Sequence, residues 1–331
     1  MAPSGLPLGV LRAQCQAPQL KPAADQRPGW AVPMEEKATF CWMEGLRDTM
    51  DLAAEMPQTR LISVCDREAD FFELFEAQRG HPCVDLLVRA HHNRVITDEP
   101  CKLFDAIRQA PLQTKVQVHV PRQSARPKLS KKKARPKRPG RQADLEVRCQ
   151  QIQLRPPKYH ADKAPLDVWV MHAVESAPPE GTDAIEWFLL TTVPVSSPED
   201  AVQCLRWYCL RWRIEDWHRV LKSGCRIGEL AHQTAERMRR AIAIHLVIAW
   251  RIMLMTLMGR ETPELPPEVL FSDIQLRVLR AYAKKTNKTA INPTGHGTTR
   301  GAYWRIPGPH QRSRTGPPTD VARLSATPTY V

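Results

Sequence analysis

The stretch LISVCDREAD, residues Leu61–Asp70, decides the fold of this chain. Leu61–Cys65 is a short, mostly apolar run of the kind found in a strand that is buried on both faces. It ends abruptly at Asp66, and the residues that follow, DREADFFELFEAQ, have the pattern of a helix that ends at Gln78, before a glycine and a proline. A buried strand followed directly by a helix predicts an α/β fold with a carboxylate at the end of the strand.

Other patterns extend this prediction in both directions. Residues 6–11 (LPLGVL) predict a short strand, and Glu35–Glu55 has the apolar spacing of a helix. Val84–Val88 predicts a second buried strand, which ends in Arg89. From about Gln113 the apolar period changes to two in four successive segments, which predicts a β-meander inserted into the α/β chain.

Helices dominate the predicted C-terminal part. Two long helices are expected at Pro198–Ser223 and Gly228–Gly259, and a shorter one at Phe271–Lys285. The longest apolar stretch, Ala241–Met258, contains a histidine and an arginine and falls short of a membrane-spanning helix, so we expect a buried core helix there. Beyond the last helix the sequence has no apolar period.

The charge of the chain is concentrated in one loop. The sequence carries 48 Lys and Arg against 35 Asp and Glu, a formal charge of +13, which favours a polyanionic partner such as nucleic acid. Ten of these bases and no acid lie in Arg122–Arg141, so the rest of the chain has 38 bases against 35 acids, or +3. Two interpretations of the loop stay open, namely a solvated basic run or an arm that contacts DNA phosphates.

Asp66 is the first candidate for chemistry. Open α/β sheets place their sites outside the carboxyl ends of strands, and Asp66 has that position in the predicted fold. An aspartate there is also a common N-cap of the helix that follows. The pattern alone favours neither role decisively.

A second constellation lies on the predicted helix that contains RWYCLRWRIEDWHRVLKSG. Tyr208, Arg211, Glu215 and Lys222 recur at spacings of +3, +4 and +7, which places them within about 60° of one another on an α-helix. Residues at such spacing that face a protein core are normally apolar, whereas these four are polar. The alternative is a solvated face with an Arg211–Glu215 pair, although Trp212 and Trp217 argue against a purely solvated helix.

These residues carry a resemblance. Asp66 within VCDREAD, together with Y-x2-R-x3-E-x6-K at 208–222, resembles the second aspartate and the signature of bacterial DDE transposases of the transposon-Tn-five and insertion-sequence-four class. The resemblance runs from about Leu6 to about Lys285. It implies an RNase H-like mixed sheet with helices, interrupted by a β-rich insertion. The implied domains are a first, incomplete part of the core (1–112), the β-rich insertion (113–197) with its basic loop (122–141), a helical second part of the core (198–285) and an irregular tail (286–331).

The resemblance also implies a mechanism. Members of this family cut and join DNA in cut-and-paste transposition by two-metal phosphoryl transfer, with Mg²⁺ or Mn²⁺ held by three carboxylates. Asp66 and Glu215 would be the second and third of these catalytic metal ligands. Tyr208, Arg211 and Lys222 would hold the phosphate beside a base that is flipped out of the transposon end.

Three further residues would contact the DNA if the resemblance holds. Trp187 would stack on the flipped base and Trp212 would lie close to it, since stacking of a base on an aromatic ring is worth about 1 to 3 kcal/mol. Packing in the core is the alternative role for Trp187. Arg89 sits near the position of a basic, DNA-contacting residue of the family.

The chain departs from the family pattern at both ends. The family carries its first catalytic aspartate on a strand upstream of residues 6–11, and the aspartates that precede Asp66 do not follow a buried strand. These are Asp25, Asp48 and Asp51. We therefore expect a chain that is truncated at its N-terminus, lacks the first strands of the sheet and is inactive by itself. For the irregular tail we hypothesise a frameshift near residues 286–318.

Two alternatives to an active enzyme stay open: a non-catalytic DNA-binding product that inhibits a full-length transposase, and a non-functional fragment. The expected partners are transposon-end DNA and a protein partner in a homodimer or in a heterodimer with full-length transposase, and no membrane. Nine cysteines without metal-binding spacing fit a reducing compartment. We therefore expect a cytoplasmic, nucleoid-associated bacterial protein.

Overall fold

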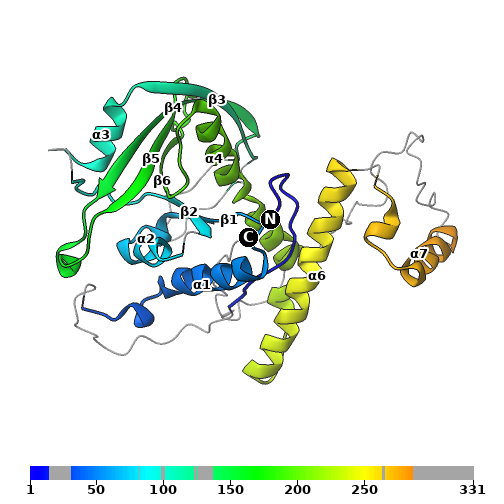
Figure 1. Ribbon diagram of the computed structural model, residues 1–331. Helices are drawn as coiled ribbons and strands as arrows, with labels where there is room; N and C mark the ends of the chain where they lie inside the picture. Colours follow the sequence, from blue (N-terminus) through cyan, green and yellow to red (C-terminus); the bar gives the residue numbers. More distant parts are fainter. Residues whose placement is uncertain are drawn as a thin grey trace. The chain divides into compact units, whose positions relative to one another are not determined.

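The computed structural model describes residues 1–14, 31–81, 83–97, 101–122, 125, 137–262 and 265–285. Two compact units make up this part of the chain (Figure 1). The first unit consists of the described residues of Pro22–Arg211, and the second of those in Met1–Lys21 and Trp212–Pro328. Asp25, most of the basic loop and the tail from residue 286 lie outside the described residues, so the expectations for them stay predictions.

One six-stranded mixed sheet forms the centre of the first unit. Its strands are β1 (Leu61–Cys65), β2 (Val84–Arg89), β3 (Leu112–Val120), β4 (Arg141–Leu154), β5 (Leu166–Glu175) and β6 (Glu186–Thr191). Their order in the sheet is β1-β2-β6-β5-β4-β3, with β1 and β2 parallel and all other neighbours antiparallel. Helices accompany the sheet, and this mixed α/β architecture is consistent with the RNase H-like fold expected from the sequence.

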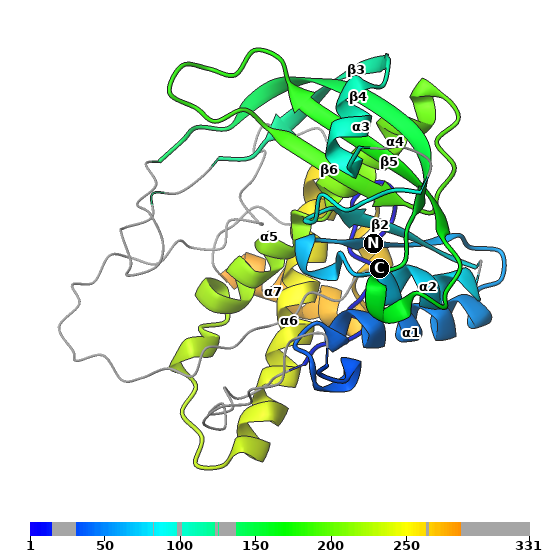
Figure 2. The same ribbon diagram turned by 90° about the vertical axis from the view of Figure 1, so that its left-hand side faces the viewer.

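The predicted β-meander is confirmed and belongs to the same sheet as the two buried strands. Strands β3, β4, β5 and β6 pair in sequence order, and β6 then pairs with β2 through contacts such as Val88 with Leu190. The long strands of the meander curve along their length (Figure 2). Because β6 runs antiparallel to β2, the start of β6 comes to the end of the sheet at which β2 finishes.

Helices cover both faces of this sheet. They are α1 (Phe40–Glu55), α2 (Phe72–Arg79), α3 (Leu103–Gln109) and α4 (Pro198–Leu210). Apolar side chains of α1, α2 and α3, such as Leu46, Phe75 and Ile107, form one core with alternate residues of the strands. The other face is covered by α4, which begins with a capping box between Ser197 and Asp200.

The regular elements described in the second unit are helices. It contains α5 (Arg213–Arg219), a π-helical turn η4 (Val220–Gly224), α6 (Ala235–Glu261) and α7 (Asp273–Lys285). Trp217 of α5 packs against α6, and its indole donates a hydrogen bond to the Leu246 carbonyl at 3.3 Å. By length and composition alone, Ala235–Arg260 passes as a membrane span, a test that core helices of soluble proteins also pass. A helix is present where a buried core helix was expected, but its burial is only partial: 28% of its most apolar window is buried, and Ile244 is 61% exposed.

Two expectations about the elements that precede β1 are wrong. Residues 6–11 form no strand, because no described strand pairs with them; instead the Pro7 carbonyl accepts a hydrogen bond from the Trp250 indole at 2.9 Å, and Leu8 is exposed. A strand is held by ladder hydrogen bonds to a neighbour, and an apolar run without that neighbour has no reason to extend. The helix expected from Glu35 begins only at Phe40, after a short 3-10 turn.

Candidate active site

Asp66 lies where the sequence predicted it, immediately after β1. Its backbone is extended, and its Oδ1 accepts a hydrogen bond from the Glu68 N–H at 3.0 Å, so it also caps the 3-10 turn Arg67–Ala69. Both proposed roles of Asp66 are compatible, because an ionised carboxylate has two oxygens and about four lone-pair sites. The cap uses one of these sites and fixes the direction of the side chain.

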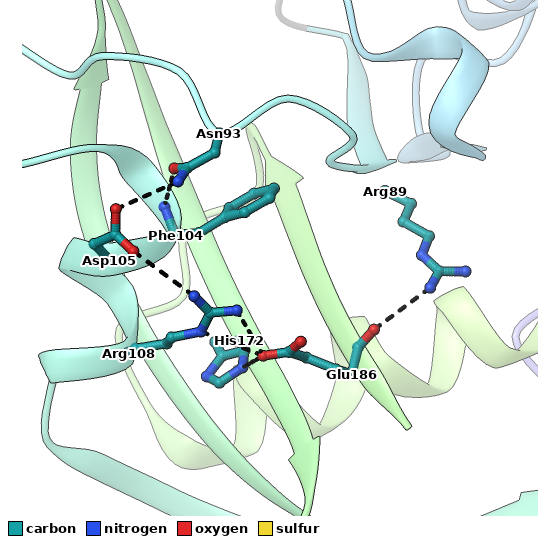
Figure 3. Close-up of polar contacts among 7 residues, drawn as sticks. All are labelled: Arg89, Asn93, Phe104, Asp105, Arg108, His172 and Glu186. Atoms are coloured by element: carbon teal, nitrogen blue, oxygen red, sulfur yellow. Dashed lines mark hydrogen bonds and ion pairs between the residues drawn. The ribbon is translucent and has the colours of Figure 1, made fainter. Parts of the chain in front are cut away.

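Arg89 ends the neighbouring strand. In the parallel pairing Cys65 is opposite Val88, so Asp66 and Arg89 follow adjacent strand ends on the same edge of the sheet. The Arg89 guanidinium is half-buried and donates to the Glu186 carbonyl at 3.4 Å (Figure 3). Burial lowers the pKa of Arg89, and the nearby Tyr208 hydroxyl acts in the opposite direction. An arginine stays protonated in proteins despite such a shift, so the group remains a cation that is partly stripped of water.

Trp187 and Tyr208 form the apolar part of the candidate site. The indole of Trp187, at the start of β6, meets the Tyr208 ring of α4 edge-on, with centroids 5.3 Å apart. The guanidinium carbon of Arg211 lies 5.7 Å from the centroid of the Tyr208 ring, within cation–π range. Trp187 is 5% and Tyr208 1% exposed. Both rings therefore belong to the folded core, as the alternative role for Trp187 anticipated, and its contact with a base stays a proposal.

The Tyr208 hydroxyl is buried beside a cation, the guanidinium of Arg89. It makes no well-formed hydrogen bond with any residue that the structure describes, although Arg89 lies close enough to influence it. A buried hydroxyl without a good partner costs free energy that an apolar group of the same shape would not. Such a group is suited to meet a ligand oxygen.

The polar helical stripe expected from the sequence is divided between the two units. The predicted helix 198–223 is wrong in its continuity: α4 ends at Leu210, two turn residues follow, and α5 passes into the π-helical turn η4. Tyr208 and Arg211 belong to the first unit. Trp212, Glu215 and Lys222 belong to the second, where Glu215 and Lys222 are exposed and Trp212 is half-buried.

A second irregularity follows α5. A π-helical turn widens the spacing from i+4 to i+5, and such turns are frequent at functional sites. After η4, Arg226 has a φ of 51°, the one left-handed residue other than glycine in the described chain. Apolar spacing in a sequence does not reveal such an insertion, because the Trp217 and Leu221 contacts with α6 keep the i, i+4 pattern.

A polar cluster that the sequence analysis missed supports the start of β6. The Glu186 carboxylate contacts His172 Nε2 at 3.0 Å and the Arg108 guanidinium at 3.1 Å (Figure 3). The imidazole also stacks on Phe188 with centroids 4.6 Å apart. Burial lowers the pKa of His172. Because Glu186 also offers its carbonyl to Arg89, this cluster fixes the strand segment that carries Trp187. Its residues come from three elements, so spacing could not reveal it.

The described residues contain no group of three His, Cys, Asp or Glu side chains that is close enough to hold a metal ion. Asp66 and Glu215 stand in different units, each described by itself. As donors they suit Mg²⁺ or Mn²⁺, which prefer oxygen ligands and few protein carboxylates. The six remaining candidates offer cations and aromatic rings, the groups that contact phosphates and bases; they are Arg89, Trp187, Tyr208, Arg211, Trp212 and Lys222.

One comparison with known proteins bears on this arrangement. The model of a protein family described as the transposase DDE domain matches residues 49–251, more than half of the 331 residues. The matched segment contains every candidate site residue, from Asp66 to Lys222. It also contains the whole sheet and α2 to α5.

Proposed function

The chain belongs to the transposase DDE domain family, and from that premise we propose that it binds the DNA ends of a cut-and-paste insertion sequence. The parallel pairing of β1 and β2 carries this proposal, because it sets the Asp66 carboxylate and the Arg89 guanidinium at adjacent strand ends. A carboxylate for a metal ion next to a cation for a phosphate is the combination that phosphodiester chemistry requires.

In this proposal each candidate residue has one task. Arg89, Arg211 and Lys222 bind backbone phosphates, and the buried Tyr208 hydroxyl donates to a phosphate oxygen. Trp187 and Trp212 contact a base that has left the helix stack. The Trp187 ring reaches a base only if its contact with Tyr208 opens, because it is 5% exposed in the structure.

Asp66 and Glu215 are the proposed ligands of Mg²⁺ or Mn²⁺. The metal ions would supply Lewis acidity and a more acidic bound water or 3′ hydroxyl for strand cleavage and transfer. The chain's own contribution is orientation: the N-cap bond to Glu68 holds Asp66 at the end of β1. Glu215 is exposed in the second unit and free to meet DNA-bound metal.

We further propose that this polypeptide binds DNA without cleaving it. The acidic residues that precede Asp66 within the described part of the chain all lie on a 3-10 turn or on α1, not at strand ends. Two carboxylates cannot position both metal ions of a two-metal site. A DNA-binding product of this kind would inhibit a full-length transposase, by occupying its DNA ends or by forming heterodimers with it.

The proposed location follows from the proposed partner. A bacterial protein that binds insertion-sequence ends works in the cytoplasm on the nucleoid. A homodimer is equally compatible with the proposal. The exposed apolar side of α6 is compatible with a protein partner as well, since large exposed apolar groups mark interaction surfaces.

DNA binding is tested by fluorescence anisotropy with a labelled duplex that carries the inverted repeat flanking the coding sequence, and a scrambled duplex as competitor. We expect salt-sensitive binding, weakened by Arg89→Met and by Arg211→Met. Lys115→Met is the matched control, because this lysine is 66% exposed on β3 and pairs only with Glu146 in the structure. Binding that is absent at low salt, or equal in all variants, would contradict the proposal.

A further inference from the structure

A cavity of about 340 Å³ lies in the first unit beside the segment that follows Asp66. Three parts of the chain line it: the approach to α1, the segment after β1 and the segment after β2. The lining residues that matter here are Lys37, Arg67, Glu68, Phe71, His91 and His92. The volume is at the lower end of the range for small-molecule sites, about 300 to 1,000 Å³, and exceeds what a lone anion needs.

Asp70 builds the rigid wall of this cavity. Its side chain is completely buried, and its Oδ2 accepts the N–H groups of His91 at 2.6 Å and His92 at 2.9 Å. Arg94 forms an ion pair with the same carboxylate and also donates to the Asp70 carbonyl. Two consecutive backbone N–H groups held by one carboxylate fix the path of the chain after β2 and thereby place both imidazoles.

The charge of the cavity is positive. The charge of Arg94 compensates that of Asp70. Two cations, Lys37 and Arg67, then stand against the single carboxylate of Glu68, and two exposed imidazoles also line the cavity. The rings of His91 and His92 stand edge to face, with centroids 4.7 Å apart. The Phe71 ring and the Met34 side chain add an apolar part to the lining. A cationic rim with an apolar wall suits a nucleotide, in which a phosphate is joined to an apolar sugar face and a base.

The cavity is connected to the candidate catalytic carboxylate. Glu68, which lines the cavity, donates its N–H to Asp66 Oδ1, and Arg67 is the next residue along the chain. A nucleotide in this cavity would therefore contact the residues that directly follow Asp66 in the chain. The residues that line the cavity do not include Arg89, Trp187, Tyr208 or Arg211.

We propose that this cavity binds one nucleotide of a DNA strand next to the phosphodiester at Asp66. Lys37, Arg67 and the two histidines contact its phosphate, and its sugar packs on Phe71. This subsite is distinct from the Tyr208 and Arg211 group, and it rests on the proposed DNA-binding function. It would hold a strand beside the one that carries the flipped base.

The test uses the full chain and fluorescein-labelled single-stranded thymidine oligonucleotides, with anisotropy measured over a range of salt concentrations. Lys37→Met and the double variant His91→Gln/His92→Gln are compared with Lys115→Met as the control on β3. The expected result is weaker binding in both cavity variants. For Lys37→Met, the slope of log Kobs against log salt concentration should become shallower by about 0.7, the value for one phosphate contact on a single strand. Thymidine monophosphate should compete at lower concentration than inorganic phosphate.

The outcomes separate this subsite from the proposed function. If oligonucleotide binding survives in both cavity variants but falls in Arg89→Met, the subsite is refuted and DNA binding stands. If the unmodified chain binds neither oligonucleotide nor duplex, both fail. If inorganic phosphate competes as well as the nucleotide, the cavity is an anion site without preference for DNA and the proposal is wrong. Lys37→Met keeps the test decisive should the double variant fail to fold, because Lys37 takes part in no ion pair among the described residues.

Discussion

The indole of Trp187 packs edge-on against the ring of Tyr208, with centroids 5.3 Å apart and ring planes inclined at 62°. This contact joins the start of β6 to the C-terminal part of α4, and both rings are almost completely buried. Two of the aromatic candidates for DNA contact are therefore one packed pair. Whatever the pair does with DNA, it also holds α4 against the sheet.

Removal of the Trp187 ring should destabilise the first unit. We expect Trp187→Ala to lower the free energy of unfolding by about 3 to 5 kcal/mol, the usual cost of a large buried aromatic ring. Trp187→Phe should cost clearly less. Urea unfolding followed by circular dichroism measures both values. A Trp187→Ala chain as stable as the unmodified one would show that the ring is not part of the core.

Tyr208→Phe should separate binding from stability. The phenylalanine keeps the ring contact with Trp187 and removes a buried hydroxyl that has no well-formed hydrogen bond among the described residues. We expect a change of less than about 1 kcal/mol in the free energy of unfolding, together with weaker binding of the transposon-end duplex. Equal duplex affinity in a stable Tyr208→Phe chain would exclude the hydroxyl as a phosphate contact.

A buried ion pair lies at Arg141, the last residue of the basic loop and the first of β4. Arg141, at the start of β4, donates two hydrogen bonds to Glu175 at the end of β5, one of them at 2.8 Å, and the Glu175 side chain is 2% exposed. Arg141→Met leaves this carboxylate buried without its partner, so we expect a loss at the lower end of about 3 to 5 kcal/mol. The double variant Arg141→Met/Glu175→Met should regain most of it in a double-mutant cycle.

The same pair predicts a pH dependence. The hydrogen bonds from Arg141 lower the pKa of Glu175 in the folded chain. Its contribution to stability is therefore present above the ordinary glutamate pKa of 4.5 and is lost as the pH falls through the lower, folded value. The difference in stability between the unmodified chain and Glu175→Gln should shrink below about pH 4.5. A difference that is constant with pH would contradict this ion pair.

His172 makes the first unit sensitive to milder acid. Burial lowers the pKa of this histidine below its ordinary value of 6.5, against the opposing effect of Glu186. The unfolded chain thus binds a proton more readily, and the free energy of unfolding should fall as the pH drops through about 6.5. His172→Gln should weaken this fall. Unfolding curves at pH 7.5 and pH 5.5 test the difference.

Local patterns in the sequence were sufficient for most elements. The apolar run Leu61–Cys65 became β1 with the predicted limits, and the alternating segments became the antiparallel meander. These predictions succeed because the burial of a strand is recorded in its own residues. The helix α3 was missed, although Leu103, Ala106 and Ile107 have helical spacing, because seven residues are too few for a strong periodic signal.

Features that depend on partners distant in the sequence could not be predicted. Residues 6–11 are as apolar as a typical strand, but they would form a strand only if a neighbouring strand paired with them. The clamp of Asp70 on the N–H groups of His91 and His92 spans 21 and 22 residues, and the Glu186 cluster joins three elements. The positions of Asp66 and Arg89 at strand ends were predicted because each follows a recognisable apolar run, whereas the break after Leu210 has no apolar signature.

The most direct test of the account combines binding and cleavage in one experiment. The purified chain is incubated with the labelled transposon-end duplex and Mg²⁺ or Mn²⁺, and bound and nicked DNA are measured in parallel for the unmodified chain, Asp66→Asn and Glu215→Gln. We predict salt-sensitive binding in all three, with no nicking above the level without protein. Metal-dependent nicking by the unmodified chain that Glu215→Gln abolishes would contradict the account.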